Sequence, residues 1–373
     1  MKVLNIITGL KGGGAEAVLY RLATNDVRNT HIVISLMDEG KYGALLKNCG
    51  IDVFCLNMPK GRLTLVGIVK LWRVLREHRS DIVQTWMYHA DLLGGVVARL
   101  AGIRNVFWNI RHADLEPGDS SMATILIARI CARLSDVVPK KIVCCAERAM
   151  HVHAELGYSK AKMVVIGNGY QLGEFKPNVN WAENIRREFG LPNVLVLGMV
   201  GRFEALKDHE NLFKSLALVR QRSVNFKVFL VGENMDANNR RVLAWLETYQ
   251  LTESVLLLGQ RGDIPQIMNA LDIHLLSSSS EAFPNVLAEA MACGTPCITT
   301  DVGDAAMIVG DTGWVVPPKR PELLAQAIDS ALNEWQTNAQ AWGKRQQSCR
   351  RRITENFSLE KMIDSYHSVW ADK

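Results

Sequence analysis

Two carboxylates frame a stretch of sequence whose residue types suit an anion site. Glu281 lies in a polar loop after the apolar run 273–278, and Glu289 lies on the helix predicted to follow. Pro284 fits the first turn of that helix, since a proline there lacks only an N–H that has no helical partner. The amides of residues 285–287 then point outward from the helix start, where the helix dipole favours a phosphate. Glu289, one turn further along, can accept hydrogen bonds from both hydroxyls of a ribose.

Two cations follow a second apolar run. Arg202 and Lys207 come directly after residues 194–200, between a predicted strand end and a helix start. Together they suit a diphosphate, because arginine offers a planar fork of donors and lysine a compact point charge. Two solvated cations beside a turn are the alternative interpretation of this pair, as two surface glutamates are for Glu281 and Glu289.

A run of three glycines, residues 12–14, follows the first apolar run, 3–8. Successive glycines let backbone N–H groups approach a phosphate or a sugar closely at a helix start. The glycines and Ala17 also fit a loose dinucleotide-binding pattern, with Asp38 at about the right distance. A tight turn between a strand and a helix is the alternative, and the lack of a Gly-Lys-Ser/Thr sequence excludes a P-loop.

The elements that must position these residues alternate between short apolar runs and helical segments, in two series. Near-continuous apolar strands between helices are typical of parallel sheets covered on both faces. A glycine-, asparagine- and proline-rich stretch at 169–180 separates the two series. We therefore predict an α/β protein with two doubly wound, Rossmann-like domains, residues 1–175 and 176–355, followed by a helical segment at 356–373.

The composition is that of an ordinary globular protein, with 48% hydrophobic and 22% charged residues among 373. No stretch approaches the roughly 18 uncharged residues of a spanning helix, and the first residues do not resemble a signal peptide. We expect a cytoplasmic protein. None of the eight cysteines forms a Cys-x-x-Cys pair, so we expect reduced core thiols and neither disulfides nor a metal site.

Positive charge is concentrated in the first half of the chain. Residues 1–170 contain 22 Lys and Arg against 14 Asp and Glu, whereas the remainder has a small excess of acids. A basic N-terminal half indicates an anionic partner on that side, such as phosphates, a nucleic acid or the anionic face of a membrane.

The three segments in this order, with the sequence DTGWVVPP at 311–318, resemble the retaining glycosyltransferases of the GT-B fold, in particular the large family-four group. The likeness spans nearly the whole chain and is strongest over 194–318. It implies two Rossmann-like domains that face each other across a cleft, the first binding the acceptor and the second the nucleotide-sugar donor. It also implies that the last helix packs back on the N-terminal domain.

The resemblance implies roles for individual residues. Arg202 and Lys207 match the family residues that bind the diphosphate, Glu281 matches the residue that contacts the transferred sugar, and Glu289 matches the residue that holds the ribose. Backbone amides between the two glutamates, the loop at Gln260 and Arg261 near the base, and the glycine loop complete the donor site. The donor-binding residues implied in this way are Gly13, Gly14, Arg261, Phe283, Pro284, Asn285, Val286, Leu287 and Glu289.

The family usually has a histidine near the reacting sugar, and this chain leaves its counterpart open. Counted from the strand 105–110, Arg111 takes that position, whereas His112 has the matching residue type. Adjacent residues on a strand point to opposite faces, so only one of the two is expected in the cleft. His89 is a third candidate, on the acceptor side. A structural hydrogen bond is the alternative role for each histidine.

The implied reaction transfers a hexose from a nucleotide-diphosphate sugar with anomeric retention. A UDP-sugar is favoured and GDP-mannose is the second choice. We expect no metal, since the sequence has no Asp-x-Asp pair, and no protein nucleophile. The expected acceptor is lipid-linked or an oligosaccharide, in the synthesis of bacterial lipopolysaccharide, capsule or exopolysaccharide, and no nucleic acid is expected to bind.

The segment 70–79 suggests where such a protein meets its acceptor. Lys70, Arg73 and Arg76 lie three apart and form a basic face that suits the anionic inner membrane. A packed helix with a solvated stripe is the alternative.

Three other functions compete with transfer: an NAD-dependent oxidoreductase, which rests on the glycines and Asp38; a sugar-nucleotide epimerase on the same two-domain fold; and a non-catalytic nucleotide-binding partner.

Overall fold

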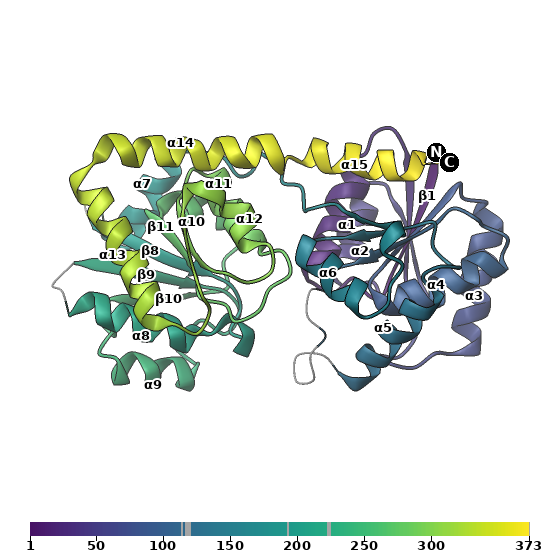
Figure 1. Ribbon diagram of the computed structural model, residues 1–373, viewed down its shortest axis with the longest axis horizontal. Coiled ribbons are helices and arrows are strands. Elements are labelled where there is room, and N and C mark those ends of the chain that lie inside the picture. The colour runs from purple at the N-terminus through teal and green to yellow at the C-terminus, as the bar shows by residue number, and fades with distance from the viewer. Residues whose placement is uncertain (113–114, 116–120, 192–193, 222–224, 373) are drawn as a thin grey trace. The chain divides into compact units, whose positions relative to one another are not determined.

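The computed structural model describes residues 1–112, 115, 121–191, 194–221 and 225–372. The chain divides into two compact units, the first comprising Met1–Gly169 with Leu359–Lys373 and the second Tyr170–Ser358. Each unit is built on one parallel sheet with helices on its faces (Figure 1). The predicted α/β class with two doubly wound domains is therefore confirmed. No described helix combines the length and the apolar character that spanning a membrane requires.

The sheet of the N-terminal unit has seven strands in the order β3-β2-β1-β4-β5-β6-β7. All its neighbouring strands are parallel, and the order reverses between β1 and β4, where an open α/β sheet binds its ligands. The strands are β1 (Lys2–Ile7), β2 (Thr30–Ser35), β3 (Asp52–Cys55), β4 (Ile82–Trp86), β5 (Val106–Ile110), β6 (Lys141–Cys144) and β7 (Met163–Val165).

Helices connect these strands, as parallel neighbours require. Their apolar stripes are buried against the sheet, for example Val18, Leu19 and Leu22 on α1. The helices are α1 (Gly14–Asn25), α2 (Gly40–Asn48), α3 (Leu65–His78), α4 (Tyr88–Leu100), α5 (Met122–Leu134), α6 (Glu147–Glu155), the short 3-10 helix η1 (Lys160–Lys162) and the C-terminal α15 (Leu359–Ala371).

Helix α15 belongs to the N-terminal unit although it ends the chain, and it lies beside α1 there (Figure 1). Trp370 donates from Nε1 to Oε1 of Gln84 at 3.0 Å, and the hydroxyl of Tyr366 accepts from Asn109 at 2.8 Å. All four side chains are buried. The chain returns to the first unit at Leu359, three residues after the predicted start of the C-terminal helical segment at 356. The second unit starts at Tyr170, six residues before the predicted boundary at 176.

The sheet of the C-terminal unit has six parallel strands in the order β10-β9-β8-β11-β12-β13, so its order reverses between β8 and β11. The strands are β8 (Leu195–Val200), β9 (Phe226–Val231), β10 (Val255–Gly259), β11 (Ile273–Leu276), β12 (Cys297–Thr300) and β13 (Trp314–Val316). Its helices are α7 (Val179–Glu188), α8 (His209–Arg220), α9 (Arg240–Thr248), α10 (Ile264–Ala270), α11 (Asn285–Ala292), α12 (Ala305–Val309), α13 (Pro321–Thr337) and α14 (Ala339–Asn356), with 3-10 helices η2 (Ala205–Lys207) and η3 (Gly310–Thr312).

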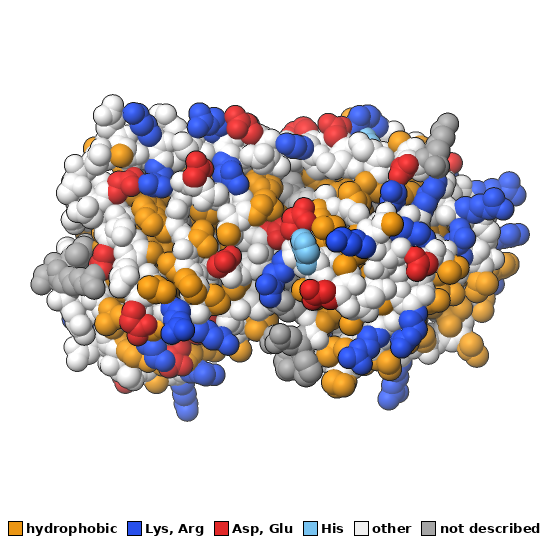
Figure 2. Space-filling model, in the orientation of Figure 1, with side chains coloured by type: hydrophobic (Ala, Val, Ile, Leu, Met, Phe, Trp, Pro, Cys, Tyr) orange, Lys and Arg blue, Asp and Glu red, His pale blue; other side chains and the backbone are white. Residues whose placement is uncertain are grey.

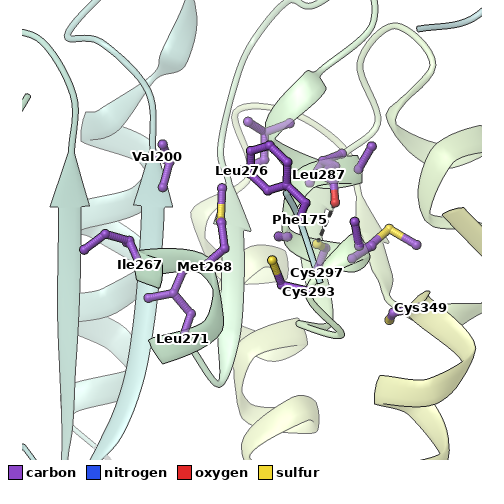
Figure 3. Packing of buried hydrophobic residues seen from close by; sticks show 14 of the residues in the cluster. Phe175, Val200, Ile267, Met268, Leu271, Leu276, Leu287, Cys293, Cys297 and Cys349 are labelled. Carbon is purple, nitrogen blue, oxygen red and sulfur yellow. Dashed lines mark hydrogen bonds between the residues drawn. The ribbon is translucent and has the colours of Figure 1, made fainter. Parts of the chain in front are cut away.

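A buried cluster packs α10, α11 and α14 on one face of this sheet (Figure 3). Cys293, Cys297 and Cys349 lie within it, and the thiol of Cys297 donates to the carbonyl of Leu287 at 3.7 Å. All eight cysteines are free thiols in the structure. Two of them, Cys49 and Cys55, are not in the core, so the predicted burial holds for the other six only.

Candidate active site

The residues that follow β8 and β11 meet at the carboxyl end of the C-terminal sheet. These two strands are neighbours at the point where the strand order reverses. Arg202 comes just after β8 and Glu281 comes after β11. Loops at such a switch point diverge to opposite sides of the sheet and leave a crevice for a ligand. The topology therefore gives a physical reason for the chemistry-bearing residues to follow these two strands.

Lys207 and Glu281 form the central contact of this edge. The ammonium Nζ lies 2.5 Å from Oε1 of Glu281, and the two side chains are only 18% and 15% exposed. The hydroxyl of Ser278 donates to the same oxygen at 2.8 Å. A charge-assisted hydrogen bond that is mostly shielded from solvent is stronger than a surface ion pair. One cation and one carboxylate, 74 residues apart in the sequence, are thus fixed side by side.

The serine run before Glu281 ties its loop to η2. The Ser277 hydroxyl donates to the carbonyls of Lys207 and Asp208, at 3.0 and 3.1 Å. The amide of Ser279 donates to the carbonyl of Leu206 at 2.8 Å. These bonds connect the loop after β11 to the segment after β8, so the Lys207–Glu281 pair is positioned by backbone as well as by side chains.

Two glycines permit the close approach of the neighbouring loops. Gly303 has φ +54°, and a Cβ there would lie 2.3 Å from the carbonyl oxygen of Ala282. The next amide, of Asp304, donates to that same oxygen at 3.0 Å. Gly232 lies equally close to the carbonyl of Gly201, which a Cβ would approach to 2.1 Å. Larger residues would therefore push apart the loops that carry the site.

Arg202 is the more solvated of the two predicted cations. Its Nε pairs with Oε1 of Glu204 at 2.5 Å, and its side chain is 54% exposed. Among the described residues, Arg202 forms its ion pair with Glu204, whereas Lys207 forms its ion pair with Glu281. The two cations follow the same strand but have different partners.

The helix start near residue 285 differs in detail from the prediction. Helix α11 begins at Asn285, so Pro284 is the residue before its first turn and not part of it. The amide of Leu287 donates to the carbonyl of Pro284 at 3.2 Å, which means that one of the three amides predicted to point outward is used within the turn. Asn285 accepts a hydrogen bond from the Tyr170 hydroxyl at 2.6 Å.

Apolar side chains of this segment serve the core. Phe283 packs edge-on against Phe357 with 5.8 Å between ring centroids, and Leu287 is completely buried. Val286 and Glu289 are partly exposed on α11.

Arg261, predicted to lie near the base, is held by two carboxylates. Its guanidinium donates to Asp263 at 2.9 and 2.7 Å and to Glu188 at 2.8 and 3.2 Å. The hydrogen bonds that Arg261 donates to Asp263 and Glu188 raise its pKa above the usual value. Any contact between Arg261 and a ligand would compete with these carboxylates.

Two buried histidines beside Lys207 were not anticipated from the sequence. His209 begins α8 and His274 lies on β11, and burial, followed by the charge of Lys207, lowers their pKa values to about 4 and about 3. Both imidazoles are therefore neutral at physiological pH. Neither ring nitrogen of either histidine has a hydrogen-bond partner among the described residues. The position of His274 within an apolar strand run could have indicated its burial, whereas His209 lies in a polar segment that gave no such signal.

The glycine loop of the N-terminal unit leads directly into α1. The helix begins at Gly14, with an extended Gly13 before it. A Cβ on Gly13 would lie 2.7 Å from a carboxylate oxygen of Glu16, so the side chain of Glu16 folds back over the loop. Asp38, which the oxidoreductase hypothesis needs for a ribose, lies 3.6 Å from the Lys11 ammonium on the surface.

The three candidates from β4 and β5 have different environments. Arg111 turns inward, donates to the side chain of Asn168 and lies over the ring of Trp86, 5.7 Å from its centroid. His112 is exposed. His89 is half-buried at the start of α4, and burial lowers its pKa. Whether Arg111 or His112 meets a sugar stays a prediction.

Comparisons with known proteins agree with this geometry. Residues 12–174 match the model of Glycosyltransferase Family 4, and residues 182–348 match that of the glycosyl transferases group 1. The first match begins after β1 and spans the other strands of the N-terminal sheet, and the second spans all strands of the C-terminal sheet. Neither an oxidoreductase nor an epimerase is favoured by these matches.

Relatives from several bacteria match most of the chain. An Escherichia coli UDP-Gal:alpha-D-GlcNAc-diphosphoundecaprenol alpha-1,3-galactosyltransferase is 25% identical over 311 residues, 82% of this chain and 79% of that protein. A capsular polysaccharide biosynthesis glycosyltransferase of Staphylococcus aureus is 23% identical over 318 residues, 82% of this chain and 80% of its own.

Solved structures share the fold at low identity. The Anabaena protein HepE, crystallised with UDP, matches over 100% of both chains with a TM-score of 0.88 and 22% identity. WaaG, a glycosyltransferase involved in lipopolysaccharide biosynthesis, matches over 100% of both chains with a TM-score of 0.73 and 17% identity. The chain therefore belongs to the glycosyltransferases of the GT-B fold, with an N-terminal domain of Glycosyltransferase Family 4 and a C-terminal domain of the glycosyl transferases group 1.

Proposed function

We propose that the protein transfers a hexose from a UDP-sugar, with retention at the anomeric carbon, to a lipid-linked saccharide during assembly of a bacterial surface polysaccharide. The observation that carries this proposal is the Lys207–Glu281 pair at the carboxyl ends of β8 and β11. The relative from Escherichia coli uses UDP-Gal and a diphosphoundecaprenol acceptor, and HepE was crystallised with UDP-glucose, which supports the same donor and acceptor classes here.

The leaving diphosphate requires positive charge as its bond to the sugar breaks. Lys207 supplies a shielded ammonium, Arg202 a more solvated guanidinium, and the start of α11 the positive end of a helix dipole. Preorganised charges of this kind stabilise a developing anion strongly, because they need no reorganisation when it forms. The proposal assigns this work to the chain's own residues and includes no metal.

Retention follows in this proposal from attack on the face that the leaving group occupies. The anomeric C–O bond to the diphosphate breaks, the acceptor oxygen bonds to the same carbon on the same face, and its proton passes to the departing phosphate oxygen. Glu281 would position the sugar and would not attack it. In support, one oxygen of its carboxylate already accepts hydrogen bonds from Lys207 and Ser278, which makes it a poor nucleophile.

A donor panel tests the proposal directly. UDP and UDP-hexoses should raise the melting temperature, because a ligand that binds only the native state stabilises it. GDP-mannose is the second donor to be compared. Transfer to a synthetic prenyl-diphosphate saccharide, followed by NMR of the new linkage, should show the anomeric configuration of the donor. An inverted product, or no stabilisation by any nucleoside diphosphate, would contradict it.

We also propose that α3 rests on the anionic inner face of the membrane, where such an acceptor is found. Its inner face is buried through Leu71 and Leu75. The outward face is apolar where a soluble helix would be polar. Its exposed apolar residues are Leu65 (82% exposed), Val66 (65%), Val69 (54%) and Trp72 (44%). Hydrophobic and basic side chains lie together over this part of the unit (Figure 2).

The basic residues of α3 complete an amphipathic, lipid-binding pattern. Lys70, Arg73 and Arg76 are exposed beside the apolar stripe, and the guanidinium of Arg76 lies 5.4 Å from the centroid of the Trp72 ring. Apolar side chains flanked by cations suit the interface of an anionic bilayer.

Vesicle flotation separates this docking surface from a merely solvated helix. The protein should float with phosphatidylglycerol-containing vesicles and much less with pure phosphatidylcholine. Val69→Glu with Trp72→Glu should abolish flotation, whereas Leu100→Glu, an apolar-to-acidic change at an exposed residue of α4, should not. Equal flotation of the α3 variant and the wild type would refute docking through α3.

A further inference from the structure

A largely apolar pocket of about 400 Å³ lies at the carboxyl edge of the N-terminal sheet. This volume is within the range of small-molecule sites. Its floor follows β1 and β2, and its walls come from α4, from α5 and from the loop that precedes α3. The lining residues are Thr8, Leu36, Met37, Met58, Pro59, Gly61, Arg62, Leu63, His89, Leu92, Leu93, Val96, Ala123 and Ile127.

The lining chemistry favours a hydrocarbon over a sugar or a nucleotide. Most of the lining atoms are aliphatic carbon and thioether sulfur, which offer a hydroxylated ligand few hydrogen-bond partners. The polar exceptions are few. Thr8 has a buried hydroxyl with no partner among the described residues, and burial lowers the pKa of His89, which favours its neutral form.

Positive charge is found on one wall. Arg62 lines the pocket, and Lys60 lies beside it on the same exposed loop. A guanidinium at the edge of an apolar pocket suits a ligand that carries a phosphate at one end of a hydrocarbon chain, because the two parts of such a ligand meet complementary surfaces.

The pocket lies next to the N-terminal end of α3. Leu63 lines the pocket, is 66% exposed, and is followed directly by the helix N-cap Thr64 and the exposed Leu65. Gly67 packs against the wall residue Met58, since a Cβ there would lie 2.4 Å from the Met58 methyl carbon. A hydrocarbon chain that leaves the pocket at Leu63 would therefore reach the exposed apolar residues at the start of α3.

We infer that this pocket binds the hydrocarbon segment of a lipid phosphate next to its phosphate group, with Arg62 pairing with the phosphate. The inference rests on the proposed function, whose acceptor is lipid-linked, and it adds the part of the lipid that the protein recognises. It assigns to the N-terminal unit a site for the carrier lipid, separate from the saccharide that receives the sugar.

Calorimetric titration with farnesyl phosphate tests the inference without any transfer reaction. Farnesyl phosphate should bind at least about tenfold more tightly than inorganic phosphate or farnesol, a difference of about 1.4 kcal/mol. Ala123→Phe, which fills the pocket from α5, should weaken binding by about tenfold or more. Leu126→Phe is the matched control, because Leu126 is an exposed residue of the same helix that does not line the pocket.

Two further variants keep the test decisive. Val96→Phe fills the pocket from α4 if Ala123→Phe does not fold, and Arg62→Ala should reduce the advantage of farnesyl phosphate over farnesol. Wild-type affinity for farnesyl phosphate in both filled variants would overturn the inference, as would equal binding of farnesol and farnesyl phosphate to the wild type. The rise in melting temperature of the wild type with UDP is measured in parallel. If UDP does not raise it, the proposed donor is refuted, whatever the result with farnesyl phosphate.

Discussion

The groups whose pKa burial shifts toward the neutral form include a carboxyl in the N-terminal unit and two imidazoles in the C-terminal unit. In the N-terminal unit, Asp91 is completely buried, and burial raises its pKa to about 8 against hydrogen bonds from Thr85 and the Asn109 amide that lower it. In the C-terminal unit, His209 and His274 are buried, with pKa values lowered to about 4 and about 3. At neutral pH all three groups are uncharged, so the shielded charges of the C-terminal site stand out against neutral surroundings.

This difference matches the ligands proposed for each unit. The C-terminal unit keeps its shielded Lys207 ammonium beside Glu281 and two neutral imidazoles, which suits a donor with two phosphates. The N-terminal unit holds Asp91 in its neutral form and has an apolar pocket, with the cations Arg62, Lys70, Arg73 and Arg76 on the exposed loop and on α3. Under these two proposals, the C-terminal unit binds a charged ligand and the N-terminal unit an amphiphilic one.

The largest expected effect is on Lys207. Lys207→Ala removes the shielded cation and leaves Glu281 without its partner, so transfer should fall by about 10²–10³-fold in kcat, as for the loss of one preorganised donor. Steady-state kinetics with a UDP-hexose measures it. Lys214→Ala removes an exposed lysine that pairs with Glu210 on α8, and it should leave the rate unchanged. Equal transfer rates for Lys207→Ala and Lys214→Ala would mean that the shielded cation of the C-terminal unit does not stabilise the leaving diphosphate.

The next effect is a loss of stability in the N-terminal unit as pH rises from acid to about 8. Above the ordinary pKa of 3.8 the unfolded chain releases the Asp91 proton, while the folded unit holds it until about pH 8. The free energy of unfolding contributed by this group therefore falls as pH rises through that window, by about 1.4 kcal/mol per pH unit. Asp91→Asn should remove this slope between pH 6.5 and 8, measured by urea unfolding.

Hydrogen exchange assigns that slope to a unit. Peptides of β4, α4 and β5 should lose protection as pH rises after correction for the intrinsic exchange rate, and peptides of β8 and β11 should not. A slope that persists in Asp91→Asn would show that a different group is responsible.

The C-terminal unit should respond in the opposite direction. Below pH 6.5 the unfolded chain binds protons on His209 and His274 that the folded unit excludes until about pH 4 and about pH 3. Stability is therefore lost as pH falls through this window, by about 1.4 kcal/mol per pH unit for each group. His274→Leu should remove one such contribution, seen as a flatter acid limb in urea unfolding. An unchanged limb would mean that the imidazole is hydrated and not held neutral by burial.

Much of the scaffold could be predicted from the sequence because its signals are local. The apolar runs at 3–8 and 194–200 became β1 and β8, since a strand covered on both faces is near-continuously apolar. The start of α11 was predicted to within one residue from Pro284. Strand β13 was not predicted, because it has only three residues and only one of them is buried.

The contacts of the site could not be predicted in the same way. The 2.5 Å contact between Lys207 and Glu281 joins two loops from different strands, and each residue alone is typical of a solvated surface. The inward turn of Arg111 depends on Trp86 and Asn168, which come from other parts of the chain. Residue type and spacing therefore predicted which residues could belong to the site. The hydrogen-bond and ion-pair partners of those residues depend on packing between distant segments and could not be predicted.

The smallest expected effect concerns Asp38, on which a dinucleotide site in the N-terminal unit would depend. Asp38 and Lys11 are both exposed, so their 3.6 Å ion pair should contribute less than about 1 kcal/mol to stability. Asp38→Ala should leave transfer within about twofold of the wild type, because an exposed surface pair contributes little in either direction. Isothermal titration with UDP-glucose and with NAD checks the same point at equilibrium. Binding of NAD that Asp38→Ala abolishes would place a nucleotide in the N-terminal unit, and the contrast between a unit for charged ligands and a unit for amphiphilic ones would then no longer hold.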